Sequence, residues 1–80
     1  MEIKVCNPCI LRKGTHIGFF SVICGAFITS GFSLHTHIIG DKETSWVIPP
    51  NGIVYISDIA EKEFKIKCIE LAKILFRLER

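Results

Sequence analysis

The chain has 80 residues, of which 49% are apolar, and its ten basic residues exceed its eight acidic residues by a formal charge of +2. This length allows a single domain, residues 1–80, and excludes a second one; so small a domain buries only about 60% of its unfolded surface. The longest apolar stretch, residues 17–28, has roughly 12 residues where a membrane span needs about 20. We therefore expect a cytoplasmic protein without a membrane partner, whose rich apolar content is partly buried against a second copy.

Cysteine usage bears on compartment and on metal binding. The residues after Met1 lack the shape of a signal peptide, which favours reduced thiols over a disulfide framework. Cys6 and Cys9 have the spacing of a redox or half-zinc motif, but only four residues separate Cys9 from the glycine of a predicted turn, too few for the helix of a redox site. Plain thiols are the expected state, and metal binding by Cys6 and Cys9 stays an open alternative. The other two cysteines are Cys24 and Cys68.

Runs of β-branched and aromatic residues, separated by turn-forming residues, predict a small β-sheet. The first run ends at Asn7-Pro8, and a turn follows at residues 12–14. Gly25 fits a hairpin turn, and residues 40–44 and 49–52 form two further polar or proline-rich turns. The predicted strands therefore cover residues 2–5, 17–24, 26–38, 46–48 and 53–56.

A C-terminal helix is the clearest predicted element. It begins at Ser57 or Asp58, and no glycine or proline interrupts the chain after that point. Apolar residues recur in steps of four and three, at Phe64, Cys68, Leu71, Leu75 and Leu78. The sequence thus predicts an α+β fold: an antiparallel sheet of about four or five strands within residues 2–57, followed by one amphipathic α-helix over about 58–78.

The side of this helix that faces away from the predicted sheet is unusual. On a helical wheel it carries basic residues and three large apolar ones, Ile66, Ile69 and Phe76. Apolar groups on an outer face favour a homodimer interface, and Trp46 is typical of an interface or core anchor. Two alternatives stay open: nucleic-acid contact in which Phe76 packs on the ligand, and lysine stems that cover scattered apolar surface.

Basic residues are the candidate binding residues. The helix and the turn at residues 12–14 should together form one positive surface that binds phosphates, made of Lys62, Lys65, Lys73, Arg77, Arg12 and Lys13. No phosphate loop, nucleophile elbow or close carboxylate pair is visible, so we expect neither an enzyme nor a cofactor. His35 and His37 lie on the same side of a strand, which suits a metal but is more typical of polar strand residues.

Three segments carry a resemblance to a known family. They are Ala26-Phe27-Ile28, Trp46-Val47-Ile48-Pro49-Pro50 and Asp58-Ile59-Ala60. Over residues 17–78 the chain resembles the SpoVG-like proteins of bacteria and phages. The resemblance implies a dimeric sheet-plus-helix subunit that binds DNA or RNA to regulate genes, through the loop after the proline and the helix. Here that loop, residues 49–52, contains no Lys or Arg.

Two functions from different classes follow from these observations. The first is a small dimeric nucleic-acid-binding regulator. The alternative is a homo-oligomeric protein–protein interaction module, such as a phage-encoded inhibitor of a host protein, with no direct nucleic-acid binding. The expected partners are therefore a second copy of the chain and either nucleic acid or another protein.

Overall fold

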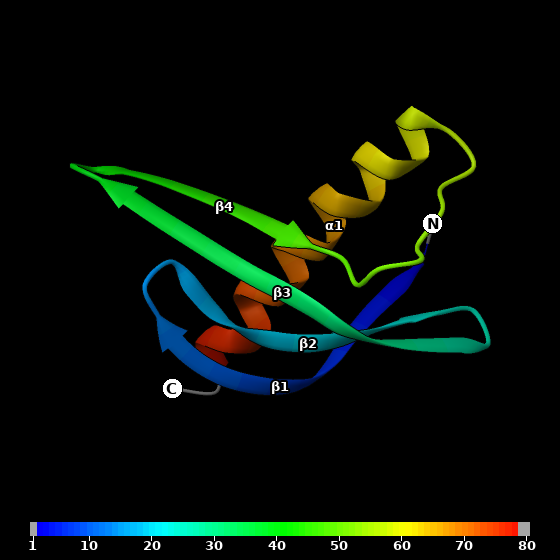
Figure 1. Cartoon of the computed structure of the whole chain (residues 1–80), viewed down its shortest axis with the longest axis horizontal. Helices are drawn as coiled ribbons and strands as arrows, with labels where there is room; N and C mark the ends of the chain where they lie inside the picture. Colours follow the sequence, from blue (N-terminus) through cyan, green and yellow to red (C-terminus); the bar gives the residue numbers. More distant parts are fainter. Residues whose placement is uncertain (1, 79–80) are drawn as a thin grey trace.

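A computed structural model describes residues 2–78 as four antiparallel strands followed by one helix (Figure 1). The strands follow one another across a single twisted sheet in the order β1-β2-β3-β4. Their bounds are β1 Ile3–Lys13, β2 His16–Cys24, β3 Phe27–Ile39 and β4 Lys42–Ile48, and the helix α1 is Asp58–Leu78. The predicted α+β class and the predicted helix are confirmed. No helix in this range is long and apolar enough to cross a membrane.

The hydrophobic core lies between one face of the sheet and α1. Successive strand residues point to opposite faces, and the alternation places Phe20 and Phe32 towards the helix, with ring centroids 5.7 Å apart. The buried apolar residues are Ile3, Phe20, Val22, Phe32, Leu34 and Val47 from the sheet and Cys68, Ala72 and Phe76 from the helix. α1 forms one side of this core. Its packing on the sheet therefore determines where its strand-facing side chains lie.

The buried stripe of α1 differs from the predicted one. Phe76, expected on the outer face, is only 3% exposed and meets Phe20 edge to face at 6.2 Å. Gly18 leaves the room for it, because a Cβ at that position would lie 2.7 Å from the Phe76 ring. The helix therefore turns Cys68, Ala72 and Phe76 inward. The predicted inward residues Phe64, Leu71 and Leu75 are half-buried, and the side chain of Leu78 lies outside the described residues.

The other predicted interface residues have mixed positions. Ile66 is 49% exposed, in agreement with an outer position. Ile69 is half-buried and packs against the core. Trp46 is half-buried on the sheet face that α1 does not cover, since its neighbour Val47 faces the core. The prediction that Ile66, Ile69 and Phe76 form one outer surface of the helix is therefore wrong.

Strand β1 is longer than predicted. The break expected at Asn7-Pro8 is wrong, because β1 continues through two irregularities in its pairing with β2, one between Cys6 and Cys9 and one between Ile10 and Lys13. β1 is an edge strand, and a proline is tolerated where the neighbouring ladder is absent. Each irregularity contains a residue with positive φ, 53° at Asn7 and 50° at Arg12. Bulges of this kind bend a strand and redirect its side chains.

The segment before the helix also departs from prediction. β4 begins at Lys42 rather than at Trp46, so the turn expected over 40–44 is shorter. Residues 53–56, predicted as a strand, pair with no strand of the sheet. They belong to a connection, residues 49–57, that loops out between β4 and α1 (Figure 1). Ser57 caps the helix, because its Oγ accepts a hydrogen bond from the Ala60 amide at 3.0 Å.

Candidate functional site

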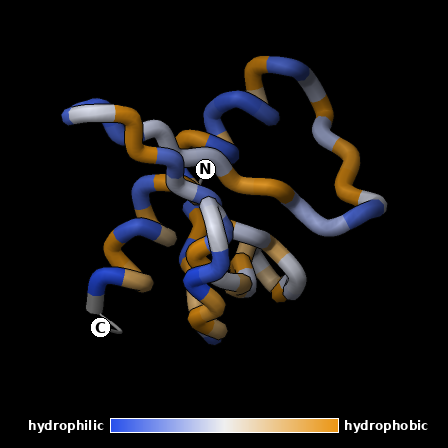
Figure 2. The backbone as a smooth tube through the Cα atoms, turned by 60° about the vertical axis from the view of Figure 1, so that its left-hand side comes forward, coloured by the Kyte–Doolittle hydropathy of each residue, from blue (hydrophilic) through white to orange (hydrophobic). Residues whose placement is uncertain are grey.

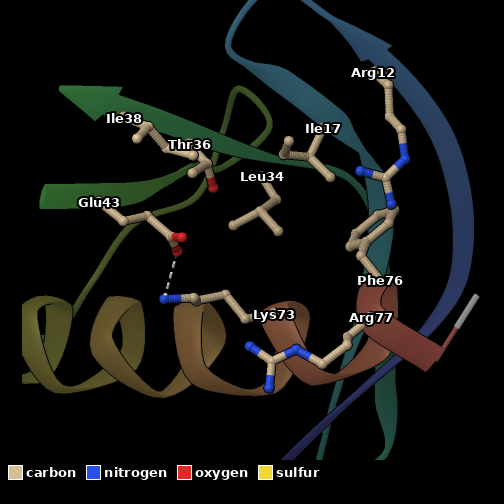
Figure 3. A pocket seen from close by; sticks show the side chains of 9 residues that line it. All are labelled: Arg12, Ile17, Leu34, Thr36, Ile38, Glu43, Lys73, Phe76 and Arg77. Atoms are coloured by element: carbon tan, nitrogen blue, oxygen red, sulfur yellow. Dashed lines mark ion pairs between the residues drawn. The ribbon is translucent and has the colours of Figure 1, made fainter. Parts of the chain in front are cut away.

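A hollow of about 210 Å³ opens at the end of the molecule where the β1–β2 hairpin, the β3–β4 hairpin and the last turns of α1 meet (Figure 3). Ile17, Leu34 and Phe76 line its apolar part. Three cations and one carboxylate surround them, Arg12, Lys73, Arg77 and Glu43. Three of the six predicted binding residues therefore lie together, although they come from two elements some 60 residues apart in the chain.

Arg12 reaches the hollow because β1 is irregular there. It follows Ile10, where the pairing of β1 with β2 shifts, and its φ is 50°. The left-handed region costs an ordinary residue roughly 1–2 kcal/mol, and glycine avoids that cost. In Figure 3 the Arg12 side chain extends from β1 towards Phe76. The position of Arg12 over the hollow therefore lowers the stability of the fold, because its backbone has a positive φ.

Lys73 and Arg77 lie one turn apart and so project from the same side of α1. Lys73 Nζ lies 3.0 Å from Glu43 Oε1 of β4, and both side chains remain partly exposed. The hydrogen bond from Lys73 and its charge lower the pKa of Glu43, and the Arg77 charge adds a smaller effect. Arg77 stands in the last turn of the helix, where the dipole favours positive charge. Glu43 is therefore ionised and holds Lys73 within the chain.

The charge of the chain is concentrated at this hollow. Its described lining carries three positive groups and one negative group, a local charge of +2. The seven basic residues that remain equal the seven remaining acidic residues in number, so the rest of the chain has no formal net charge. The net positive charge of the chain is small, but it is concentrated at the hollow. A local positive charge of this kind attracts anions.

The other three predicted binding residues do not line the hollow. Lys62 and Lys65 lie near the start of α1, and Lys62 is about 16 Å along the helix axis from Lys73. Lys65 donates a hydrogen bond to Glu61 at 2.8 Å. Lys13 is exposed next to Arg12 but is absent from the lining. The single positive surface expected from the sequence is therefore divided.

A column of stacked rings lies on the sheet face opposite α1. His16, His35 and Trp46 are partners in successive register pairs. The ring of His35 stacks on His16 at 4.5 Å and on Trp46 at 5.4 Å. Burial, and then the neighbouring His16, lower the pKa of His35. Both faces of the His35 ring are therefore covered by its neighbours, and the column packs three adjacent strands together.

The fold does not bring the histidines and cysteines together as a metal site. Across residues 2–78, no three His, Cys, Asp or Glu side chains stand close enough together to hold a metal ion. His37 is exposed and all four cysteines are free. Cys68 is fully buried, and burial, with a smaller effect from Cys24, raises its thiol pKa to about 12. This thiol is therefore protonated and unreactive at neutral pH.

Replacement of Arg12 by glycine should separate the role of the side chain from that of the backbone. We expect Arg12→Gly to raise the free energy of unfolding by about 0.5–1 kcal/mol, since relief of the positive φ exceeds the entropy that glycine adds to the unfolded chain. Anion binding should weaken at the same time. Chemical denaturation and a binding titration measure the two effects, and Lys13→Gly is the control for general loss of charge. Unchanged affinity would show that the Arg12 side chain does not bind the anion, and a fall in stability would show that the positive φ at this position carries no strain.

Comparison of the chain with protein-family models, with curated proteins and with solved structures finds no match. We therefore infer a function from the residues that line the hollow.

Proposed function

We propose that this chain is a small nucleic-acid-binding regulatory protein that holds backbone phosphates in the hollow formed by Arg12, Lys73 and Arg77. The observation that carries the proposal is the meeting of these three cations, which bring the entire net charge of the chain to one place. The regulatory role follows the resemblance to SpoVG-like proteins noted in the sequence.

The donor set suits phosphate. Each guanidinium presents several N–H donors in a planar fork that matches two phosphate oxygens, while Lys73 adds a compact point charge. The apolar lining from Ile17, Leu34 and Phe76 forms the other part of the hollow, and Arg12 and Arg77 beside it remain exposed to an incoming ligand. The volume of about 210 Å³ is many times the roughly 10–15 Å³ that one water needs by the same measure, so the hollow has room for a phosphate group.

Contacts to phosphate fix position without reading sequence. Apart from the charged groups, Thr36 is the polar side chain of the described lining, so the hollow itself has little capacity to distinguish bases. We therefore expect binding at a single hollow to depend more on salt than on sequence. Any sequence preference has to come from groups outside the hollow.

A salt titration tests the proposal. Binding of labelled single-stranded DNA, duplex DNA and RNA is measured between about 50 and 200 mM salt, where release of counterions from three phosphate contacts should weaken affinity by about 20- to 40-fold. The three ligands show which form of nucleic acid the hollow prefers. Affinity that does not change with salt, or no binding to any of the three at low salt, would contradict the proposal.

Neutralisation of Glu43 should improve binding. In Glu43→Gln, Lys73 loses its internal partner and the hollow loses its negative charge, so affinity should rise by about fivefold, the equivalent of an exposed ion pair worth about 1 kcal/mol. Stability should change by less than that amount, because both side chains of the pair are partly exposed.

Glu61→Gln is the matched control, since it releases Lys65 from a similar pair outside the hollow. The two variants gain the same net charge. Equal improvement in both would indicate a general charge effect and not a site at the hollow.

A further inference from the structure

The connection between β4 and α1, residues 49–57, is hereafter called the arm. Figure 2 shows it as an arc that stands away from the sheet and carries hydrophobic stretches. From Trp46 to Ser57 the chain contains no charged residue. Val54 is 90% exposed and Ile56 is 97% exposed, the highest values among the exposed large apolar residues of the described chain. Residues 53–56 of the arm therefore have the composition of a buried strand and the exposure of a loop.

The arm also has the alternation of a strand. Ile53 packs against the core and the Tyr55 ring lies 5.7 Å from that of Phe64, whereas Val54 and Ile56 point outward. Within residues 2–78 no backbone hydrogen bond outside the regular elements reaches positions 53–56. Backbone groups in this state form a bare edge on which another strand can pair.

Exposed apolar residues also occur on α1, directly after the arm. Ile59 is 71% exposed, and Ile66, seven residues later and so on the same side of the helix, is 49% exposed. Together with Val54 and Ile56 they expose on the order of a few hundred Å² of apolar surface, the size that marks an interaction site. Of the four residues expected at an oligomer interface, Ile66 lies in this surface.

We propose that the arm pairs with the arm of a second copy and forms the centre of a homodimer. Two identical strands that run antiparallel about a twofold axis at Tyr55 place Val54 of each copy opposite Ile56 of the other, so the apolar side chains face like partners. The nearest charged residue, Asp58, then lies opposite Gly52 of the second copy. The symmetric pairing therefore buries no charge and sets no like charges against each other.

The two edges of the sheet are poorer partners for the arm. β4 begins with Lys42 and Glu43, and β1 carries Lys4 and Arg12; charged side chains on an edge strand oppose the addition of an uncharged apolar strand. β2 and β3 also lack charged residues, but both already pair within the sheet; among the described residues the arm is the uncharged, strand-like segment that pairs with no strand. The site of pairing precedes α1, and Ile59 is about 21 Å along the helix from Lys73, so both hollows stay open in the dimer.

Light scattering of the nucleic-acid-free protein over a wide range of concentrations tests this inference. We expect the native chain to have twice its single-copy mass of 9.0 kDa, and Ile56→Asp and Val54→Asp to have the single-copy mass with unchanged circular dichroism. Ile39→Asp is the matched control, because Ile39 is 70% exposed at the β3–β4 hairpin, and it should keep the doubled mass. A native single-copy mass, a doubled mass in both arm variants, or a loss of the dimer in Ile39→Asp would each overturn the inference.

The inference is independent of nucleic-acid binding, and the same variants separate the two. The Lys73→Glu/Arg77→Glu protein should keep the doubled mass, and Ile56→Asp should still bind a short oligonucleotide at each hollow. A single-copy native protein that binds nucleic acid contradicts the arm pairing alone. A dimer that fails to bind contradicts the proposed function alone.

Discussion

Reversal of Lys73 and Arg77 to glutamate should abolish nucleic-acid binding, with a loss of at least about 100-fold in affinity. The double change takes the local charge of the hollow from +2 to −2, because Glu43 already contributes one negative charge. Each phosphate contact made by these residues disappears, and a repulsive charge takes its place. Fluorescence anisotropy with a labelled oligonucleotide at near-physiological salt measures the effect.

The matched control is the double reversal Lys62→Glu/Lys65→Glu on the first half of the same helix. It changes the net charge of the protein by the same amount but lies beyond the screening length of about 8 Å from the hollow. We expect it to weaken binding by no more than about threefold. Similar losses in the two proteins would mean that overall charge, not the hollow, determines binding.

Truncation of Phe76 to alanine should strongly destabilise the protein. The ring is 3% exposed, and it fills the space above Gly18. Removal of a buried phenylalanine costs about 3–5 kcal/mol, which approaches the roughly 4–12 kcal/mol that holds a domain of this length. Thermal unfolding followed by circular dichroism should show a midpoint lower by about 15–30 °C.

Ile74→Ala provides the comparison, because Ile74 is on the same helix and 54% exposed. Its replacement should cost less than about 1 kcal/mol. Similar effects of the two truncations would contradict the buried position of Phe76. They would support the outer position that the sequence predicts.

The elements that sequence patterns locate best are those encoded locally. The apolar spacing and the lack of glycine and proline predict a helix over about 58–78, and the helix spans Asp58–Leu78. The second strand and the turn at Gly25 were found for the same reason, since aromatic and β-branched residues end at a glycine with φ 61°. In each case neighbouring residues contain enough information to define the element.

The features that escaped prediction depend on distant residues. Phe76 lies inward because Gly18, far away in the sequence, leaves space for its ring. β1 crosses Asn7-Pro8 because it is an edge strand with an irregular register, which no local pattern reveals. Residues 53–56 of the arm have the composition and alternation of a strand, but a strand needs a neighbour, and within one chain they have none among the described residues.

The same distinction applies to the candidate site. Arg12, Lys73 and Arg77 were found as basic residues, but their meeting depends on the irregularity in β1 and on the angle of α1 across the sheet. Glu43 was missed because its partner lies 30 residues later, and no spacing signals the pair. The ring column was missed in a similar way, since His16 joins His35 only through the register of β2 and β3.

An NMR titration of the isotope-labelled protein with a short oligonucleotide tests the phosphate-binding hollow most directly. We expect the largest shifts at the backbone amides of Arg12, Lys73 and Arg77 and at their side-chain N–H groups, while the Trp46 indole on the opposite face of the sheet stays unchanged. Shifts centred on Trp46 or on the arm, with none around the hollow, would contradict the account.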